Sequence, residues 1–216
     1  METFIKNYGK KSRHHFKLIN FLYSELKKLK SENILEFGVS EKAMSTELFL
    51  EYARHKNCKL YSIDNVDYSS KFNENRWKFI HSRDDEYALI RKIIPKEFGL
   101  ILLDTIHEAT HVKKIIYKYY NLLKVNSCFF IDDISWIPYL KDNDKNRFYA
   151  EINNFETFKL LLEILNNNRE NINIDFNFHG TGMCKILKLN KKKLNPPKKI
   201  ITRRNSLKNF IRKIFK

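Results

Sequence analysis

The sequence has no apolar run of about 18 residues, so it predicts no helix that spans a membrane. Residues 1–16 lack the apolar core of a signal peptide and give no indication of export. Only three cysteines are present, at Cys58, Cys128 and Cys184, and no two of them form a CxxC pair. Together, these absences predict a cytoplasmic protein whose thiols are reduced and buried.

Acidic residues are absent from residues 191–216, here called the tail, which hold eleven Lys and Arg residues. The whole chain carries 41 basic and 25 acidic residues, a formal net charge of +16. Residues 1–190 therefore keep 30 basic against 25 acidic residues, a net charge of only +5. The positive charge, which would otherwise indicate nucleic-acid binding, belongs mainly to the tail.

The remaining composition is that of a globular protein. With 216 residues, of which 43% are hydrophobic and 14% aromatic, the chain can bury one substantial core. We expect an N-terminal helical segment over residues 1–30, one domain over residues 31–190, and the separate tail. A helix over residues 15–30 places six apolar side chains on one face. These are Phe16, Ile19, Leu22, Tyr23, Leu26 and Leu29.

The stretch NILEFGVS, residues 33–40, predicts a buried strand that leads into a turn. Gly38 lets the chain turn without a Cβ penalty. Residues 42–55 place apolar side chains at helical spacings, so a helix follows the turn. A strand, a glycine turn and a helix form the opening unit of a doubly wound α/β domain, whose ligands bind at the carboxyl ends of the strands.

Further strands and helices alternate along the chain. Strands are predicted at residues 59–65, 77–81, 98–104 and 127–133, and helices at residues 82–94 and 109–123. The alternation predicts a parallel sheet with helices on both faces, and the most apolar strand, 98–104, is expected at its centre.

The last third of the chain departs from this alternation. A helix is predicted at residues 155–165, followed by strand-like runs at residues 171–178 and 183–190. Four residues, HGTG, join the two runs, a spacing typical of a β-hairpin. We therefore expect an antiparallel pair to close the sheet.

Asp64 ends the second predicted strand, roughly 20–30 residues after the glycine turn. At this distance, dinucleotide-binding folds place a carboxylate that accepts a hydrogen bond from a ribose hydroxyl. Asp64 is therefore the candidate ribose-binding residue. The alternative is that this strand-end aspartate only caps its turn.

Three carboxylates follow two other strands. Asp104 ends the strand at residues 98–104, and Asp132 and Asp133 end the strand at residues 127–133. Neighbouring strands lie about 4.8 Å apart, so these side chains can meet at one point. Because three carboxylates repel one another, a hard divalent cation such as Mg²⁺ or Ca²⁺ is the natural counter-charge. The alternative is that Asp132 and Asp133 cap a turn and that Asp104 contacts only a cofactor.

Two histidines lie near this acidic group. His107 is a candidate general base, because a histidine side chain titrates near neutral pH without help. The alternative is that His107 only makes local hydrogen bonds at the start of a helix. His111 lies one turn further along the same face and is a second candidate for lining the site. Trp136, Pro138 and Tyr139 are candidates for an aromatic wall beside an acceptor ring, and the alternative is that they are loop residues that pack over the sheet.

The order and spacing of these motifs resemble class I S-adenosylmethionine-dependent methyltransferases, in particular the small bacterial O-methyltransferases related to macrocin O-methyltransferase. The resemblance to the catechol and caffeoyl-CoA enzymes is more distant. The stretches ILEFGVS…ST, LLDTIHEATHV and FFIDD carry the resemblance, which covers about Ser31 to Asn190. It implies a Rossmann-like sheet of five parallel strands closed by a C-terminal β-hairpin. The family usually has a second glycine before the S-T pair, where this chain has Lys42 and Ala43.

The resemblance also implies roles for single residues. The implied cofactor-binding residues are Glu36, Gly38, Asp64, Ser82, Asp84 and Asp104. The first two would line the methionine part of S-adenosylmethionine, Asp64 would hold its ribose, and Ser82 or Asp84 would lie beside its adenine. The implied catalytic residues are His107 and Asp104, and the implied metal ligands are Asp104, Asp132 and Asp133. In the metal-dependent members, the cation chelates two substrate hydroxyls and lowers the pKa of the one that is methylated.

The tail predicts a basic amphipathic helix. From Asn205, the sequence NSLKNFIRKIFK repeats apolar residues at helical spacing, and its basic residues fall off this stripe. The stripe consists of Leu207, Phe210, Ile211, Ile214 and Phe215. Such a helix suits an anionic membrane surface or a partner groove. RNA or DNA is the alternative partner, and a helix folded back on its own domain is the structural alternative.

Taken together, these features predict an S-adenosylmethionine-dependent O-methyltransferase assisted by Mg²⁺ or another hard divalent cation. Its acceptor would be a hydroxyl of a small molecule, sugar or glycan, in the cytoplasm or at the inner face of the cell membrane. Two other classes stay open. One is a nucleic-acid methyltransferase that binds RNA through the tail, and the other is a binding module that kept the fold and lost catalysis. A homo-oligomer is also open.

Overall fold

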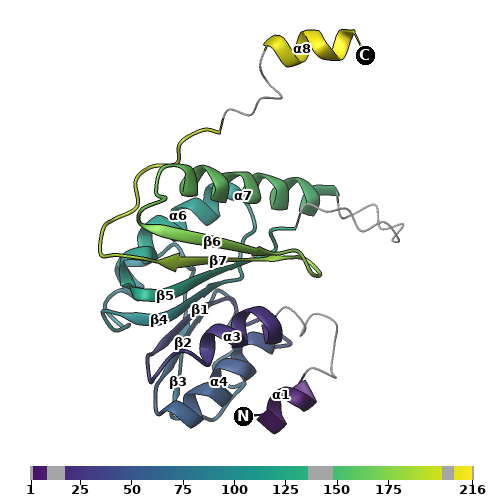
Figure 1. Cartoon of the computed structure of the whole chain (residues 1–216). Helices are drawn as coiled ribbons and strands as arrows, with labels where there is room; N and C mark the ends of the chain where they lie inside the picture. Colours follow the sequence, from purple (N-terminus) through teal and green to yellow (C-terminus); the bar gives the residue numbers. More distant parts are fainter. Residues whose placement is uncertain (1, 9–17, 136–147, 201–206, 216) are drawn as a thin grey trace.

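The computed structural model describes residues 2–8, 18–135, 148–200 and 207–215. Seven strands form one sheet in the order β3-β2-β1-β4-β5-β7-β6 (Figure 1). The strands are β1 (Ile34–Phe37), β2 (Leu60–Asp64), β3 (Trp77–His81), β4 (Phe98–Leu103), β5 (Leu123–Asp132), β6 (Ile172–Asn177) and β7 (Met183–Lys188). β1 to β5 are parallel, whereas β7 and β6 add an antiparallel hairpin. This arrangement confirms the predicted Rossmann-like sheet and its closing hairpin.

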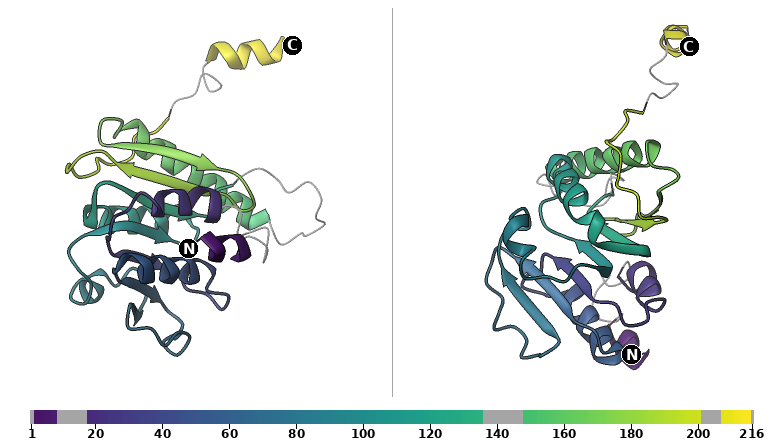
Figure 2. Two further views of the ribbon diagram at one scale, coloured as in Figure 1. Left: turned by 60° about the horizontal axis from the view of Figure 1, so that its bottom comes forward. Right: turned by 90° about the vertical axis from the view of Figure 1, so that its left-hand side faces the viewer.

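Helices cover both faces of the sheet (Figure 2). The helices are α1 (Glu2–Tyr8), the π-helix η1 (Leu18–Leu22), α3 (Tyr23–Leu26), α4 (Met44–Lys56), α5 (Tyr87–Ile90), α6 (Ala109–Tyr119), the 3₁₀-helix η2 (Tyr120–Leu122), α7 (Phe148–Asn166) and α8 (Leu207–Ile214). α1, η1, α3 and α4 pack on one face, and α5, α6 and α7 pack on the other. None of the helices in the described ranges is long and apolar enough to cross a membrane.

β4 shows how the sheet separates two apolar cores. All of its residues are buried, and alternate side chains of a strand point to opposite faces. Leu100 and Leu102 join the core beneath α4, whereas Ile101 and Leu103 join the core beneath α6 and α7. Burying each of these side chains contributes roughly 1.5–3 kcal/mol. β4 occupies the middle of the seven-stranded order, as its apolar sequence predicts.

The N-terminal helical segment differs in detail from its prediction. Leu22 and Leu26 are buried as expected, but Leu18, which the predicted face omits, is buried with them. Residues spaced by four lie on one side of a helix, so Leu18 completes that stripe. Phe16, part of the predicted face, lies outside the described residues. The segment therefore packs on the sheet through a stripe that is rotated from the predicted one.

The helix predicted at residues 82–94 is wrong over most of its length, because only α5 is helical there. The preceding segment is held in an irregular path by α6. Lys118 Nζ donates a hydrogen bond to the carbonyl of Asp85 at 2.8 Å, and Tyr119 Oη donates to the carbonyl of Asp84 at 2.9 Å. These contacts satisfy carbonyls that a helix would bond internally, so tertiary packing overrides the helical pattern.

The C-terminal hairpin brings its connecting loop beside the end of β5. β7 pairs with β5 as well as with β6. The backbone N–H of Asp133 donates to the carbonyl of Gly182 at 3.1 Å, and that of Ser135 donates to the carbonyl of Thr181 at 2.8 Å. A Cβ on Gly182 would lie 2.6 Å from the nitrogen of Ser135, so the close approach requires glycine. The hairpin thereby fixes residues 133–135, directly after the acidic end of β5.

Candidate functional site

Two adjoining cavities lie at the carboxyl ends of the parallel strands. The first, the β2-side cavity, has a volume of about 260 Å³. Its lining residues are Gly38, Ser40, Ile63, Asp64, Asn65, Arg83, Asp84, Asp104, Thr105 and Ile106. The second, the β5-side cavity, has a volume of about 230 Å³. Its lining residues are Leu18, Ser40, Met44, Ser45, Leu102, Asp104, Asp132, Asp133 and Thr181. Ser40 and Asp104 line both cavities, so the two spaces meet at these residues.

The turn after β1 supplies residues to both cavities. Gly38 has a φ of +92°, and a Cβ there would lie 1.9 Å from the carbonyl oxygen of Asp104, so only glycine fits. Ser40 and Ala43 also take left-handed backbone conformations, with φ of 59° and 45°. Each non-glycine residue in this region carries a strain of about 1–2 kcal/mol. The chain therefore forms the turn without a second glycine, and α4 begins only after Ala43.

Asp64, at the end of β2, links that strand to the turn. Its Oδ2 accepts hydrogen bonds from the backbone N–H groups of Val39, at 2.8 Å, and Ser40, at 3.4 Å. Its Oδ1 accepts from the N–H of Val66 at 2.9 Å. Asp64 thus caps its own turn and at the same time lines the β2-side cavity. Its contact with a ribose stays a prediction.

Glu36 lies on β1 beneath the turn and is fully buried. Ser45 Oγ donates to Oε1 at 2.6 Å, whereas Thr46 Oγ1 and Ser62 Oγ donate to Oε2 at 2.9 and 2.6 Å. Burial raises the pKa of Glu36 to about 7, although the three hydroxyl donors oppose that shift. Glu36 lines neither of the two cavities. It joins β1, β2 and α4 below them, and its predicted contact with the methionine part of a cofactor stays a prediction.

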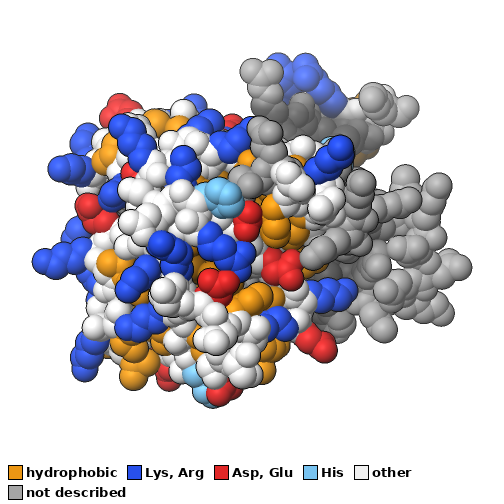
Figure 3. Space-filling model, turned by 90° about the horizontal axis from the view of Figure 1, so that it is seen from below, with side chains coloured by type: hydrophobic (Ala, Val, Ile, Leu, Met, Phe, Trp, Pro, Cys, Tyr) orange, Lys and Arg blue, Asp and Glu red, His pale blue; other side chains and the backbone are white. Residues whose placement is uncertain are grey.

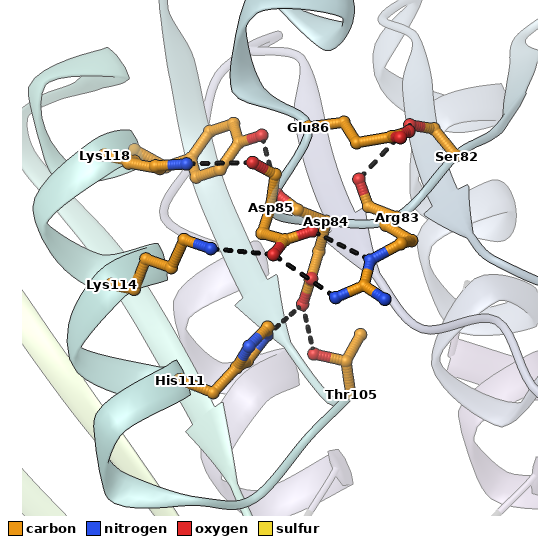
Figure 4. Close-up of polar contacts among 10 residues, drawn as sticks. Ser82, Arg83, Asp84, Asp85, Glu86, Thr105, His111, Lys114 and Lys118 are labelled. Atoms are coloured by element: carbon orange, nitrogen blue, oxygen red, sulfur yellow. Dashed lines mark hydrogen bonds and ion pairs between the residues drawn. The ribbon is translucent and has the colours of Figure 1, made fainter.

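Asp84 is the buried end of a hydrogen-bonded group between β3 and α6 (Figure 4). Its Oδ2 accepts from Thr105 Oγ1 at 2.5 Å and lies 2.8 Å from His111 Nε2. Ser82, the other predicted adenine contact, donates instead to Glu86 Oε2 at 2.6 Å and does not line the cavity. Of the two candidates, only Asp84 borders the β2-side cavity.

The charged residues next to Asp84 hold this segment on α6. Asp85 lies 3.0 Å from Arg83 Nε and 2.7 Å from Lys114 Nζ (Figure 4). The Arg83 and Lys114 cations keep the pKa of Asp85 well below its usual range. Because Asp85 is paired in this way, its neighbour Arg83 is positioned at the edge of the β2-side cavity.

His107 and three aspartates form the polar group of the β5 side. Asp104, Asp132 and Asp133 line the β5-side cavity together. His107 Nε2 lies 3.4 Å from Asp133 Oδ2 and 3.8 Å from Asp104 Oδ1. Thr157 Oγ1, on α7, donates to the carbonyl of His107 at 3.2 Å and fixes its backbone. The His107 side chain is 29% exposed, so a ligand can reach its ring.

The predicted metal ligands do not form a coordination shell. Across residues 2–8, 18–135, 148–200 and 207–215, no three His, Cys, Asp or Glu side chains are grouped so that they could hold a metal ion. The ring of His107 takes the position beside Asp104 and Asp133 where an ion would offset their charge. The donor set in this arrangement does not fit a divalent cation, and the metal site stays a prediction.

The two histidines that the sequence places on one helical face serve different neighbours. His107 faces the aspartates of the β5 side, whereas His111 faces Asp84 on the β2 side. The aromatic wall predicted from Trp136, Pro138 and Tyr139 lies outside the described residues.

Several lining residues were missed by sequence reasoning. Thr105 and Ile106 directly follow Asp104, so extending the strand-end motif by two residues would have found them. Leu18, Met44 and Thr181 come from distant segments of the chain, and no local sequence signal marks them. The β5-side cavity is therefore the less predictable of the two.

The comparisons with known proteins concern the fold. The sequence matches no protein-family model, and no curated protein matches it. The methyltransferase PaMTH1 of Podospora anserina, bound to S-adenosylhomocysteine, superposes with a TM-score of 0.60 at 18% identity. That match covers 78% of this chain and 76% of PaMTH1. A candidate caffeoyl-CoA O-methyltransferase from Staphylococcus aureus gives a TM-score of 0.59 at 16% identity, over 81% of this chain and 90% of that one.

A third similar structure is the MycE methyltransferase of the mycinamycin biosynthetic pathway, in complex with Mg and S-adenosylhomocysteine. It gives a TM-score of 0.60 at 15% identity over 83% of this chain. The match covers 52% of MycE, so this chain spans about half the length of that protein. At these identities, the three likenesses establish that this chain shares its fold with S-adenosylmethionine-dependent methyltransferases.

Proposed function

We propose that this protein is an S-adenosylmethionine-dependent O-methyltransferase. The observation that carries the proposal is the pair of adjoining cavities, one bordered by Asp64 and Asp84 and the other by three aspartates beside His107. In α/β sheets of this kind, ligands bind at the carboxyl ends of the strands. PaMTH1 and MycE, which share the fold, were both solved with S-adenosylhomocysteine, the product that such a transfer leaves behind.

The β2-side cavity suits the adenosine part of the cofactor. Asp64 Oδ1 accepts a hydrogen bond from Val66 and retains a second acceptor site for a ribose hydroxyl. Ile106 lines the same cavity with its side chain 45% exposed, which offers an apolar surface to an adenine ring. Asp84 is held in place by Thr105 and His111 at the far side. These groups would bind the two ends of adenosine without rearranging the strands.

Asp104 and His107 are the groups that we place at the chemistry. S-adenosylmethionine supplies a methyl group on a positively charged sulfur. An acceptor oxygen attacks the methyl carbon in line with the C–S bond, and the sulfur leaves. Asp104 lines both cavities, so its carboxylate lies where they meet and offsets positive charge there. His107 Nε2 takes the proton of the acceptor hydroxyl as the new C–O bond forms and the C–S bond breaks. Asp133 and Asp104, 3.4 and 3.8 Å away, stabilise the imidazolium that results.

The lining of the β5-side cavity favours one class of acceptor. Leu18, Met44 and Leu102 provide apolar surface, and three aspartates provide negative charge. An anionic acceptor would be repelled by these carboxylates, whereas an uncharged or cationic compound with hydroxyl groups would not. We therefore favour a sugar or small-molecule hydroxyl over a nucleic acid as the acceptor.

Assistance by Mg²⁺ is a separate prediction, since the aspartates are not arranged as a coordination shell. The MycE complex contains Mg, which motivates a direct test. Turnover is measured in EDTA and again after MgCl₂ is added in excess. Equal rates assign proton removal to His107 alone, and a rate that requires Mg²⁺ shows that the aspartates rearrange around an ion.

The experiment that tests the proposal is a comparison of two histidine variants. Release of S-adenosylhomocysteine is measured over a panel of sugars and phenols for the wild type, His107→Gln and His55→Gln. His55 is exposed at the end of α4 and serves as the matched control. We expect His107→Gln to lower kcat by about 10²–10⁴-fold while affinity for S-adenosylhomocysteine is kept.

Other outcomes would contradict the proposal. Equal kcat in the wild type and His107→Gln would remove His107 from the reaction. Methylation of RNA together with refusal of every sugar and phenol would establish the nucleic-acid alternative. A protein that binds no cofactor and shows no turnover would be the non-catalytic module.

A further inference from the structure

α8 presents five large apolar side chains to water. Leu207, Phe210, Ile211, Ile214 and the adjoining Phe215 expose between 46 and 84% of their surfaces. They recur at spacings of three and four residues, so they lie along one side of the helix. Elsewhere in the described ranges, exposed large apolar side chains occur singly or in small groups, such as Ile152 and Phe155 on α7, and none forms a stripe of five. The stripe on α8 is therefore a surface that needs a partner.

α8 stands away from the rest of the described molecule (Figures 1 and 2). A helix of eight residues is too short to be stable in water alone, so the stripe must be covered for the helix to persist. The sheet is covered on both faces by other helices, and α8 belongs to neither apolar core. Within the described part of the chain, no element of the domain covers the stripe, so we take its partner to lie outside the domain.

The first part of the tail, up to Lys198, is hydrogen-bonded to the body. Tyr117 Oη donates to the carbonyl of Asn195 at 2.5 Å, and the N–H of Lys198 donates to the carbonyl of Glu163 at 3.0 Å. These bonds hold residues 195–198 next to α6 and α7, and the rest of the tail continues from there. Whatever binds α8 therefore holds the whole domain nearby.

The charge of the tail specifies the partner. All eleven of its ionisable side chains are basic, and two of them, Lys208 and Arg212, are exposed on α8 itself. On the face of the body shown in Figure 3, Lys and Arg side chains are instead interspersed with Asp and Glu. A purely cationic segment next to an apolar stripe complements a surface that is anionic outside and apolar just beneath. An anionic lipid bilayer has both properties.

Nucleic acid and a second copy of this chain each suit only one of the two properties of the tail, its basic charge or its apolar stripe. Nucleic acid would take the basic residues and the two phenylalanines of the stripe, but the three aliphatic members of the stripe offer it no stacking surface. A second copy of this chain would bring another net charge of +16 and would be repelled. We propose that the tail docks the protein on an anionic lipid surface, with the α8 stripe inserted at the headgroup boundary. This proposal does not depend on the methyl transfer proposed above.

The test is co-sedimentation of the full chain, without cofactor, with vesicles of phosphatidylcholine alone or with about 30% phosphatidylglycerol. We expect binding only to the anionic vesicles. The variant Phe210→Glu/Ile214→Glu is expected to lose at least about a hundredfold in partitioning, because it removes two apolar side chains from the stripe. The variant Lys208→Glu/Arg212→Glu is expected to lose at least about 25-fold, from about fivefold per basic residue.

A matched control separates the tail from net charge. Lys92→Glu/Lys96→Glu changes the net charge by the same amount, and both residues lie on the surface of the body before β4. We expect its partitioning to stay within about twofold of the wild type. Circular dichroism of each variant verifies that the domain is folded. We expect each variant to fold, because all six substituted residues are exposed.

Three results would overturn the proposal. The first is an absence of binding to anionic vesicles at millimolar lipid. The second is an equal loss in the Lys92→Glu/Lys96→Glu control, which would make the attraction a property of net charge. The third is tight binding of an RNA oligonucleotide that the Phe210→Glu/Ile214→Glu variant retains, with no binding to vesicles.

Discussion

The two cavities share Ser40 and Asp104 but are built in different ways. The β2-side cavity is lined by the ends of β1, β2 and β4 and by the segment after β3, all within residues 38–106. The β5-side cavity draws on residues as distant as Leu18 and Thr181. A cavity made from consecutive strand ends is determined by the order of strands alone. A cavity assembled from distant segments depends on how the N-terminal helices and the C-terminal hairpin pack, so it can differ between proteins that share the fold.

The largest effect is expected at Gly38, in the turn after β1. Gly38→Ala places a Cβ 1.9 Å from a backbone oxygen at a φ of +92°, so it should lower the free energy of unfolding by at least about 3 kcal/mol. Gly180→Ala, in the hairpin loop beside Thr181, meets nothing within 4 Å and should cost about 1 kcal/mol. Urea denaturation measures both. Equal losses would show that the turn after β1 relaxes around the added methyl group, which the close approach of the Asp104 carbonyl rules out.

Glu36, beneath the turn, should make stability depend on pH. Burial raises its pKa to about 7 from 4.5, so the folded protein binds the proton more tightly between these two values. The free energy of unfolding should therefore fall as pH rises from 4.5 to about 7, by roughly 3 kcal/mol, and then level off. Glu36→Gln should remove this slope, and the exposed control Glu41→Gln should keep it. A slope that persists in Glu36→Gln would assign it to another group.

Asp64 tests whether the β2-side cavity binds the cofactor. Asp64→Ala removes a charged acceptor from a ribose hydroxyl and from the turn, so affinity for S-adenosylhomocysteine should fall about 100-fold, or about 2.7 kcal/mol. Asp67→Ala, in the exposed loop beyond β2, is the matched control and should leave affinity unchanged. Calorimetric titration measures both constants. An unchanged affinity in Asp64→Ala would place the ribose elsewhere.

The smallest effects are expected among the charged pairs between β3 and α6. His111→Ala leaves the buried Asp84 carboxylate without one of its partners and should cost about 2 kcal/mol of stability. Lys114→Ala breaks its pair with Asp85, but the Lys114 side chain is 48% exposed, so the loss should stay below about 1 kcal/mol. Chemical denaturation at low and high salt distinguishes the two. A larger loss of stability for Lys114→Ala than for His111→Ala would show that the exposed pair contributes more than the buried one, contrary to this expectation.

Most of the fold follows from local patterns. Every predicted strand is present, and β4, the most apolar of them, is buried at every position, as a strand covered on both faces requires. The helix predicted at residues 109–123 is present as α6 and η2, and its apolar side chains Val112, Ile115 and Tyr119 are buried. Where strand and helix periods are strong, tertiary contacts reinforce the local preference, and the prediction succeeds.

The differences arise where distant contacts oppose the local pattern. The segment before α5 has a helical pattern, but the side chains of Lys118 and Tyr119 bind its carbonyls. The pairing of Asp84 with His111 joins residues 27 positions apart, so no spacing along one helix could indicate it. Leu18 and Thr181 likewise reach the β5-side cavity only because distant segments of the chain pack together. The strand-end candidates Asp64 and Asp104 were identifiable because the sheet topology alone places them at the site.

A calorimetric titration of the full chain with S-adenosylhomocysteine, with ATP as the control ligand, shows whether the two cavities bind the cofactor. The two cavities and their carboxylates predict a dissociation constant of micromolar order, about −8 kcal/mol, and no comparable heat with ATP. An absence of binding up to millimolar S-adenosylhomocysteine would contradict the proposed function, because the cavities would then not hold the cofactor that the proposed reaction requires.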